Sequence, residues 1–150
     1  EKRMRARLPA GVKMYTGDDF NYAELIAGDG RHVSHGLLGI FDPIAPAAAA
    51  ALDRLAAGDT DGYHAILGPT VALSRRIFEA PTQYYKAGVV LLAWLNGFQD
   101  HVRMLGGMES ARGLLHYADL FRLADQARLL IDPDRAAHRM RLLCAVNGIA

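Results

Sequence analysis

Two short apolar runs near the start of the chain limit what it can fold into. Residues 11–20 and 35–43 each end abruptly in polar, turn-forming residues, at positions 16–19 and 42–43. A strand buried in a parallel sheet has this pattern, because both of its faces are covered and its carboxyl end opens into a loop. Residues 19–27 lie between the runs and carry apolar side chains at near-helical spacing. The sequence therefore predicts a strand–helix–strand unit.

The remainder of the chain is predicted to be helical, so only two strands are available. Two parallel strands do not make a stable sheet alone, because each keeps an unpaired edge. The length of 150 residues suits one domain. We therefore predict the C-terminal part of a larger α/β fold. Residues 1–45 are expected to hold its last two strands and the helix between them, and residues 46–150 its closing and C-terminal helices.

The helices are predicted from apolar spacing and from Pro and Gly punctuation. A helix opens at Pro46, and a second helical segment is expected to break at Gly68-Pro69. Residues 89–95 are apolar nearly all round, which predicts burial between layers or at a subunit contact. Further helices are predicted over residues 110–130 and 134–146.

Composition excludes several functional classes. A net charge of +1, with scattered basic residues, gives no nucleic-acid footprint. No apolar run is long enough to span a bilayer, so no membrane role is predicted. The single cysteine, Cys144, excludes an internal disulfide and is typical of a cytoplasmic protein. His32 and His35 have metal-like spacing, but the loop around them lacks a ligand set, so no metal site is predicted.

An ordered set of short motifs carries a family resemblance. Tyr-Thr-Gly-Asp-Asp at 15–19, His-Gly-Leu-Leu-Gly-Ile at 35–40, Ala-Ala-Gly-Asp at 56–59 and Pro-Thr-Gln-Tyr-Tyr-Lys at 81–86 occur in this order. The set resembles the second half of the dihydrodipicolinate synthase and N-acetylneuraminate lyase family, and more narrowly an uncharacterised branch of it. The resemblance covers about residues 8–133. It implies strands seven and eight, plus the C-terminal helices, of a (β/α)8 TIM barrel.

The resemblance also implies a chemistry. Members of the family are lyases of the aldolase type, which join a lysine amine to pyruvate or a related 2-oxo acid as a Schiff base. Gly11-Val12-Lys13 looks like the family's lysine motif, but that lysine belongs to strand six. If Lys13 were on strand six, no eighth strand would follow. The favoured prediction therefore places the Schiff-base lysine N-terminal to Glu1, with Lys13 as the alternative.

The implied cofactors and partners follow from this chemistry. No metal or organic cofactor is expected, because the lysine itself acts as the electron sink. The expected partners are a small 2-oxo acid substrate, the N-terminal half of the barrel, and further copies of the chain in a homo-oligomer.

Substrate-binding residues are predicted at the carboxyl ends of the two strands, where barrel enzymes build their active sites. They are Thr16, Gly17, Asp18, Asp19, Leu38, Gly39 and Asp42. By resemblance, Gly17 and Asp18 match the family's Gly-Asp pair, and the backbone carbonyl of Leu38 faces the substrate. Asp18 and Asp19 also precede a helix, where carboxylates cap free N–H groups. Phe41 and Asp42 depart from the family pattern and would shrink and recharge the pocket.

Two alternative functions remain open from the sequence. The first is a barrel enzyme of other chemistry that holds a phosphate on the same loops, where Gly17 and Gly39 let backbone N–H groups approach. The second is a non-catalytic helical assembly module, in which residues 89–95 and the last helix form a subunit contact.

Overall fold

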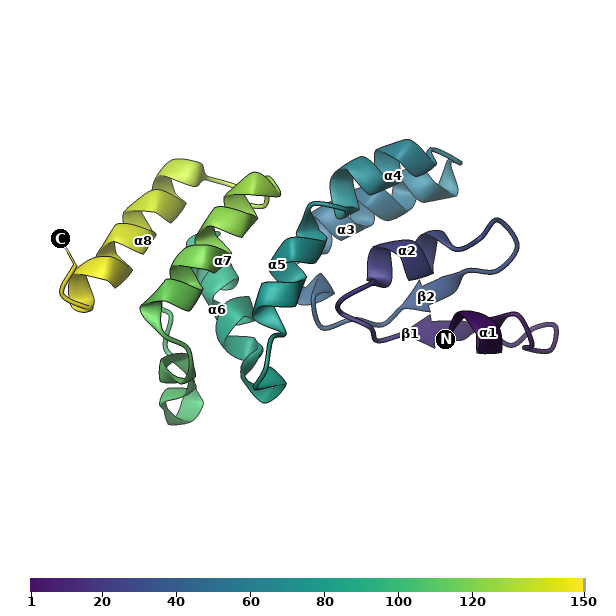
Figure 1. The fold of residues 1–150 in the computed structure, drawn as a ribbon. Helices are drawn as coiled ribbons and strands as arrows, with labels where there is room; N and C mark the ends of the chain where they lie inside the picture. The colour runs from purple at the N-terminus through teal and green to yellow at the C-terminus, as the bar shows by residue number, and fades with distance from the viewer. Residues whose placement is uncertain (150) are drawn as a thin grey trace. The chain divides into compact units, whose positions relative to one another are not determined.

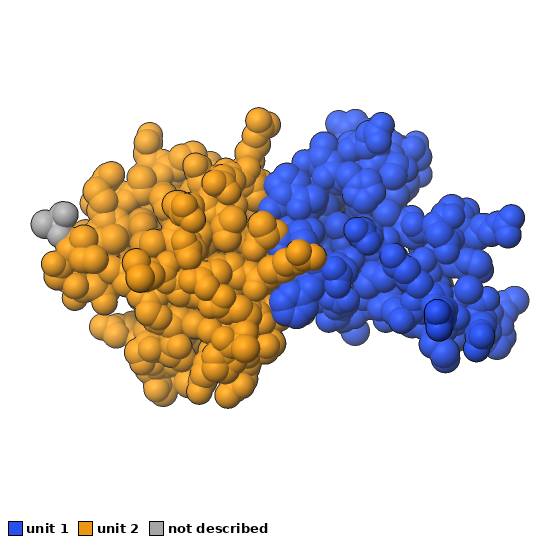
Figure 2. Space-filling model, in the orientation of Figure 1, with its two compact units in different colours: residues 1–71 blue, residues 72–150 orange. Residues whose placement is uncertain are grey.

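The structure is a computed structural model that describes residues 1–149 (Figure 1). The chain forms two compact units, Glu1–Val71 and Ala72–Ala150 (Figure 2). Most of the described residues are helical, and the strands among them form one two-stranded sheet. Within residues 1–149, no helix combines the length and the apolar character needed to cross a membrane.

Unit 1 begins with the sheet. After the short helix α1 (Lys2–Arg5), β1 (Met14–Thr16) pairs in parallel with β2 (Ser34–Gly36), and α2 (Tyr22–Ala27) connects the strands. The predicted strand–helix–strand unit is therefore confirmed, although both strands are shorter than expected. The register joins Met14 to Ser34 and Thr16 to Gly36. Buried Arg5 donates to the carbonyl of Leu25 at 2.8 Å and so links α1 to α2.

The prediction that this is the strand-seven and strand-eight end of a TIM barrel is wrong. The two strands pair only with each other within the described chain, and every later element in residues 1–149 is helical. A barrel strand needs a hydrogen-bonded neighbour on each side. Strands of three residues can also form only a few hydrogen bonds with a neighbouring strand. Residues 1–149 are instead mostly helical, with one two-stranded parallel sheet.

Helices form the rest of unit 1. Helix α3 (Phe41–Ala56) packs along α4 (Thr60–Leu67), and α2 also contacts α4. Helix α3 begins before the predicted start at Pro46. Because Pro46 has no N–H to donate to Asp42, the first turn bends, with Ile44 at φ −118°. The fully buried side chains of this unit include Tyr22, Ile40, Ile44, Tyr63 and Leu67.

Unit 2 is helical in the described residues, with two short 3₁₀ segments between its α-helices. The predicted break at Gly68-Pro69 is confirmed, because α4 ends at Leu67 and α5 (Thr70–Ile77) starts after it. A 3₁₀ turn, η1 (Thr82–Tyr84), then leads into α6 (Lys86–Leu95). A second 3₁₀ segment, η2 (Leu105–Ala111), precedes α7 (Leu114–Gln126) and α8 (Pro133–Val146).

Helix α6 supplies much of the core of unit 2. It packs against α7 and α8, which also contact each other. Leu91, Leu92 and Leu95 are buried, so the predicted burial of this apolar helix within the protein is confirmed. Just beyond α6, the buried amide of Asn96 donates to the carbonyl of Leu129 at 3.0 Å and accepts from the N–H of Ile131 at 2.9 Å. Asn96 thereby fixes the connection between α7 and α8.

Candidate functional site

The residues that follow β1 form a tight turn into α2. Thr16 is buried, and its hydroxyl oxygen accepts from the N–H of Asp18 at 3.2 Å. The Asp18 carboxylate accepts from the N–H groups of Phe20 at 2.9 Å and Asn21 at 3.1 Å. Carboxylates at such turns satisfy N–H groups that have no partner within the helix. Asp18 therefore shapes the entry to α2, the structural role that the sequence also suggested for it.

The segments after the two strands lie beside each other. The N–H of Leu37 donates to the carbonyl of Thr16 at 2.9 Å, directly beyond β2. The N–H of Ile40 donates to the Asp19 carboxylate at 2.9 Å. The structure thus brings the predicted residues of the first strand end next to those of the second. Leu38 is buried, Gly39 is half-buried, and Asp42 is exposed in the first turn of α3.

Asp19 lies in a partly buried environment close to two other carboxylates. Burial raises the pKa of its carboxyl group above the ordinary value, and the nearby carboxylates of Asp18 and Asp42 raise it further. Hydrogen bonds from the N–H groups of Ile40 and Gly39 oppose this shift without cancelling it. The strand ends therefore gather three carboxyl groups, and negative charge at this place disfavours the binding of a phosphate.

The other residues that the sequence raised lie outside this cluster. Lys13 is exposed immediately before β1. The His35 ring packs against the Tyr15 ring at 5.4 Å between centroids, and His32 lies 3.5 Å from the Asp29 carboxylate. Among residues 1–149, no group of three or more His, Cys, Asp or Glu side chains is arranged to hold a metal ion.

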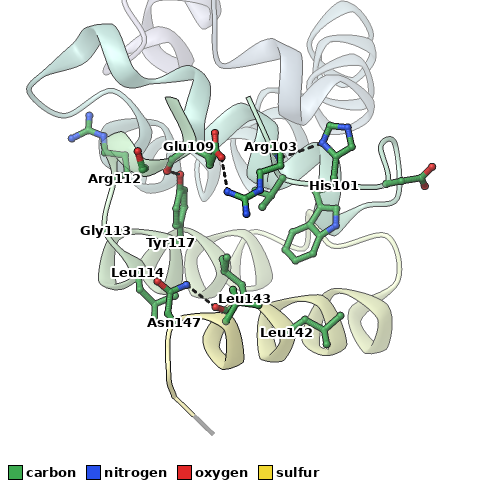
Figure 3. A pocket seen from close by; sticks show the side chains of 15 residues that line it. His101, Arg103, Glu109, Arg112, Gly113, Leu114, Tyr117, Leu142, Leu143 and Asn147 are labelled. Carbon is green, nitrogen blue, oxygen red and sulfur yellow. Dashed lines mark hydrogen bonds and ion pairs between the residues drawn. The ribbon is translucent and has the colours of Figure 1, made fainter. Parts of the chain in front are cut away.

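Unit 2 contains a pocket that the sequence did not predict (Figure 3). Its apolar lining includes Trp94 of α6, Leu114 of α7, and Leu143 and Val146 of α8. Residues 100–113 supply most of its polar lining. The pocket arises because packing joins segments that are far apart in the chain, so no local spacing signals it.

The fold defines a class: a mostly helical protein of two compact units, one of which carries a parallel strand–helix–strand element. The chain belongs to the DUF993 family, whose model, described as a protein of unknown function, matches residues 1–149. No curated protein matches the chain. The family match does not extend to dihydrodipicolinate synthase, so that resemblance stays a prediction.

Proposed function

We propose that the strand-end loops of unit 1 take part in a lyase reaction on pyruvate or a related 2-oxo acid. The observation that carries the proposal is the Asp19 carboxyl group, which bonds to the second loop at 2.9 Å and has a raised pKa. A carboxyl group whose pKa is shifted toward neutrality is suited to exchanging a proton with a substrate. The order of short motifs along residues 8–133 supports the same chemistry by resemblance.

The reaction has two covalent stages. A lysine amine condenses with the ketone of the substrate, releasing water and forming an imine. When the carbon–carbon bond breaks, a base accepts the proton of the substrate hydroxyl and a carbonyl forms on the departing fragment. The electron pair of the broken bond moves toward the iminium nitrogen and gives an enamine. In the proposal, Asp19 accepts that proton, and the amine belongs to a lysine N-terminal to Glu1, with Lys13 as the alternative.

The charge of the loops orients the substrate in this proposal. The strand ends disfavour the binding of a substrate carboxylate, because they already carry the carboxyl groups of Asp18, Asp19 and Asp42. The carboxylate of the 2-oxo acid would therefore point away from the strand ends, and its hydroxyl end toward Asp19. A neutral hydroxyl can donate to an ionised Asp19 without adding charge to the site.

Borohydride trapping tests the imine. The protein, produced from its natural coding sequence, is incubated with pyruvate and borohydride, and its intact mass is compared with an untreated control. We expect one reduced pyruvyl group on one lysine, which peptide mapping then locates. The Asp19→Asn variant should still trap pyruvate but release the aldol fragment at least about tenfold more slowly, in the range for loss of a proton-transfer group. Asp53→Asn, at an exposed position on α3, is the matched control.

The outcomes separate the parts of the proposal. An adduct at Lys13 would place the amine within this chain, and an adduct at a lysine N-terminal to Glu1 would follow the favoured alternative. An adduct at Lys2 or Lys86 would contradict both placements. If no lysine traps pyruvate, the lyase proposal fails. If Asp19→Asn and Asp53→Asn cleave substrate equally fast, Asp19 is not the proton acceptor.

A further inference from the structure

The pocket of unit 2 has the dimensions of a small-molecule site. Its volume is about 670 Å³, within the range of roughly 300–1,000 Å³ that is usual for such sites. Every lining residue lies between Trp94 and Asn147, so the site belongs to unit 2 alone. The inference below concerns a different part of the protein from the lyase proposal and does not depend on it.

One wall of the pocket is apolar and partly open to solvent. Trp94, Leu114 and Leu143 line it together with Leu142 and Val146 of α8. Leu142 keeps 49% of its surface exposed and Val146 keeps 81%. Covering such surface with an apolar ligand removes it from water, which contributes roughly 25 cal/mol for each Å² buried. The wall therefore suits a hydrocarbon or aromatic group.

The opposite side carries an ion pair whose carboxylate is already engaged. Glu109 accepts from Arg103 Nη1 at 2.9 Å and from the N–H of Met104 at 3.0 Å (Figure 3). The hydrogen bond from Arg103, followed by backbone hydrogen bonds, lowers the pKa of Glu109, so this group is ionised at neutral pH. Arg103 uses Nη1 for this pair, and its side chain is 79% exposed. Its Nε and Nη2 groups are therefore available as donors to a ligand.

His101 contacts the backbone of the same segment. Its Nδ1 accepts from the N–H of Arg103 at 3.2 Å, which leaves the ring proton of the neutral form on Nε2. Two other polar groups are engaged elsewhere, since the Tyr117 hydroxyl donates to the carbonyl of Glu109 and the Ser110 hydroxyl to that of Gly107.

Arg112 does not compete for a ligand in the pocket. Its guanidinium donates to the carbonyls of Glu79 at 2.7 Å and Pro81 at 3.1 Å. In Figure 3 this guanidinium points away from the pocket. Asp100 and Asn147 also line the pocket, and Asn147 donates to the carbonyl of Leu143. The donors that Arg103 keeps available favour an oxyanion beside its guanidinium.

We propose that this pocket binds an amphipathic organic acid. The ligand's carboxylate is held by Arg103, and its aliphatic or aromatic body lies against Trp94, Leu143 and Val146. The planar guanidinium allows Arg103 to bridge two carboxylates, with Nη1 on Glu109 and its remaining donors on the ligand. A neutral analogue of the same shape loses the charge-assisted bonds and keeps only the apolar contact.

Calorimetric titration of the full chain with octanoate and with 3-phenylpropionate tests the proposal, and octanamide is the neutral control. We expect saturable one-to-one binding of both acids and about tenfold weaker binding of the amide, the ratio that 1.4 kcal/mol produces. Arg103→Gln should weaken octanoate by about tenfold and leave the amide unchanged. Arg122→Gln is the matched control, because Arg122 is an exposed arginine that pairs with Asp119 at 3.0 Å outside the pocket.

Three results would overturn the assignment: no saturable binding of either acid, equal affinity for octanoate and octanamide, or octanoate binding that is insensitive to Arg103→Gln. The acid–amide comparison uses the unaltered protein, so it does not depend on whether any variant folds. A second variant, Val146→Ser at an exposed position, should weaken octanoate more than acetate. If the variant weakens the binding of octanoate and acetate equally, the apolar wall does not contribute to binding.

Discussion

Replacing Asn96 with alanine removes an amide that joins the end of α6 to the connection between α7 and α8. Asn96 is 6% exposed and lies at the end of α6, where it donates to Leu129 and accepts from Ile131. Alanine fits this backbone conformation, with φ −84° and ψ −2°, so the substitution changes hydrogen bonding without forcing the main chain. The partner groups belong to the connection between α7 and α8, where the N–H of Leu129 also donates to the carbonyl of Ala124 at 2.9 Å.

The size of the effect follows from the two bonds. Leu129 is 8% exposed, so its carbonyl would be left without a partner in a nearly dry environment. Such a group costs about 1–3 kcal/mol. Ile131 is 61% exposed, so water can replace Asn96 at its N–H, and that loss is nearer 1 kcal/mol. We therefore expect Asn96→Ala to lower the free energy of unfolding by about 2–4 kcal/mol.

Urea unfolding followed by tryptophan fluorescence measures this change. Trp94 is the single tryptophan of the chain and lies two positions before Asn96, so its emission reports on unit 2. With slopes of roughly 1–3 kcal/mol per molar urea, the midpoint should fall by about 1 M or more. The control is Asn147→Ala, because Asn147 is exposed and its amide makes one bond within α8, to the carbonyl of Leu143 at 2.8 Å. Equal shifts for the two variants would refute the reasoning.

Two further predictions concern pH and backbone geometry. Burial, followed by the charges of Arg76 and Arg112, lowers the pKa of His116 below its ordinary 6.5, although Glu79 opposes the shift. The contribution of this group to stability is therefore complete above about pH 6.5 and is lost as the pH falls toward the lower folded-state pKa. His116→Asn should flatten the fall of the urea midpoint between about pH 7 and 5. If the variant shows the same pH dependence as the unaltered protein, His116 is not its cause. Gly28→Ala should lower the thermal midpoint more than Gly30→Ala. Both glycines have positive φ, but only at Gly28 would the new Cβ lie 2.3 Å from the carbonyl oxygen of His32, and equal shifts would contradict this.

Local patterns predicted the elements of this protein better than their assembly. The strand–helix–strand unit and the break at Gly68-Pro69 follow from apolar runs and turn residues, and both are present. The second strand was extended too far because buried Leu38 and Ile40 look like strand residues, whereas they form a turn. Asp42 and Pro43 suited a loop after a strand, yet both also fit the first turn of a helix, where α3 places them.

The barrel was predicted wrongly and the pocket of unit 2 was not predicted, for different reasons. The order of the motifs along the chain predicted which helices and strands follow one another. It did not indicate whether further strands pair with β1 and β2. The pocket of unit 2 depends on how α6, α7 and α8 pack, which brings Trp94, Arg103 and Val146 together from distant positions. The two strand ends lie beside each other, and the bond from the N–H of Ile40 to Asp19 could be seen only in the three-dimensional structure.

The sheet of unit 1 has a consequence for handling the protein. No third strand joins β1 or β2 within residues 1–149, so each strand presents one open edge. Open edges attract strands from other molecules and can start aggregation, and proteins often limit this risk by keeping such strands short. Each of these strands has three residues, so an incoming strand would gain few hydrogen bonds. Because the strands are so short, the sheet has few hydrogen bonds of its own. For the same reason it is a poor template for the growth of fibres in concentrated samples.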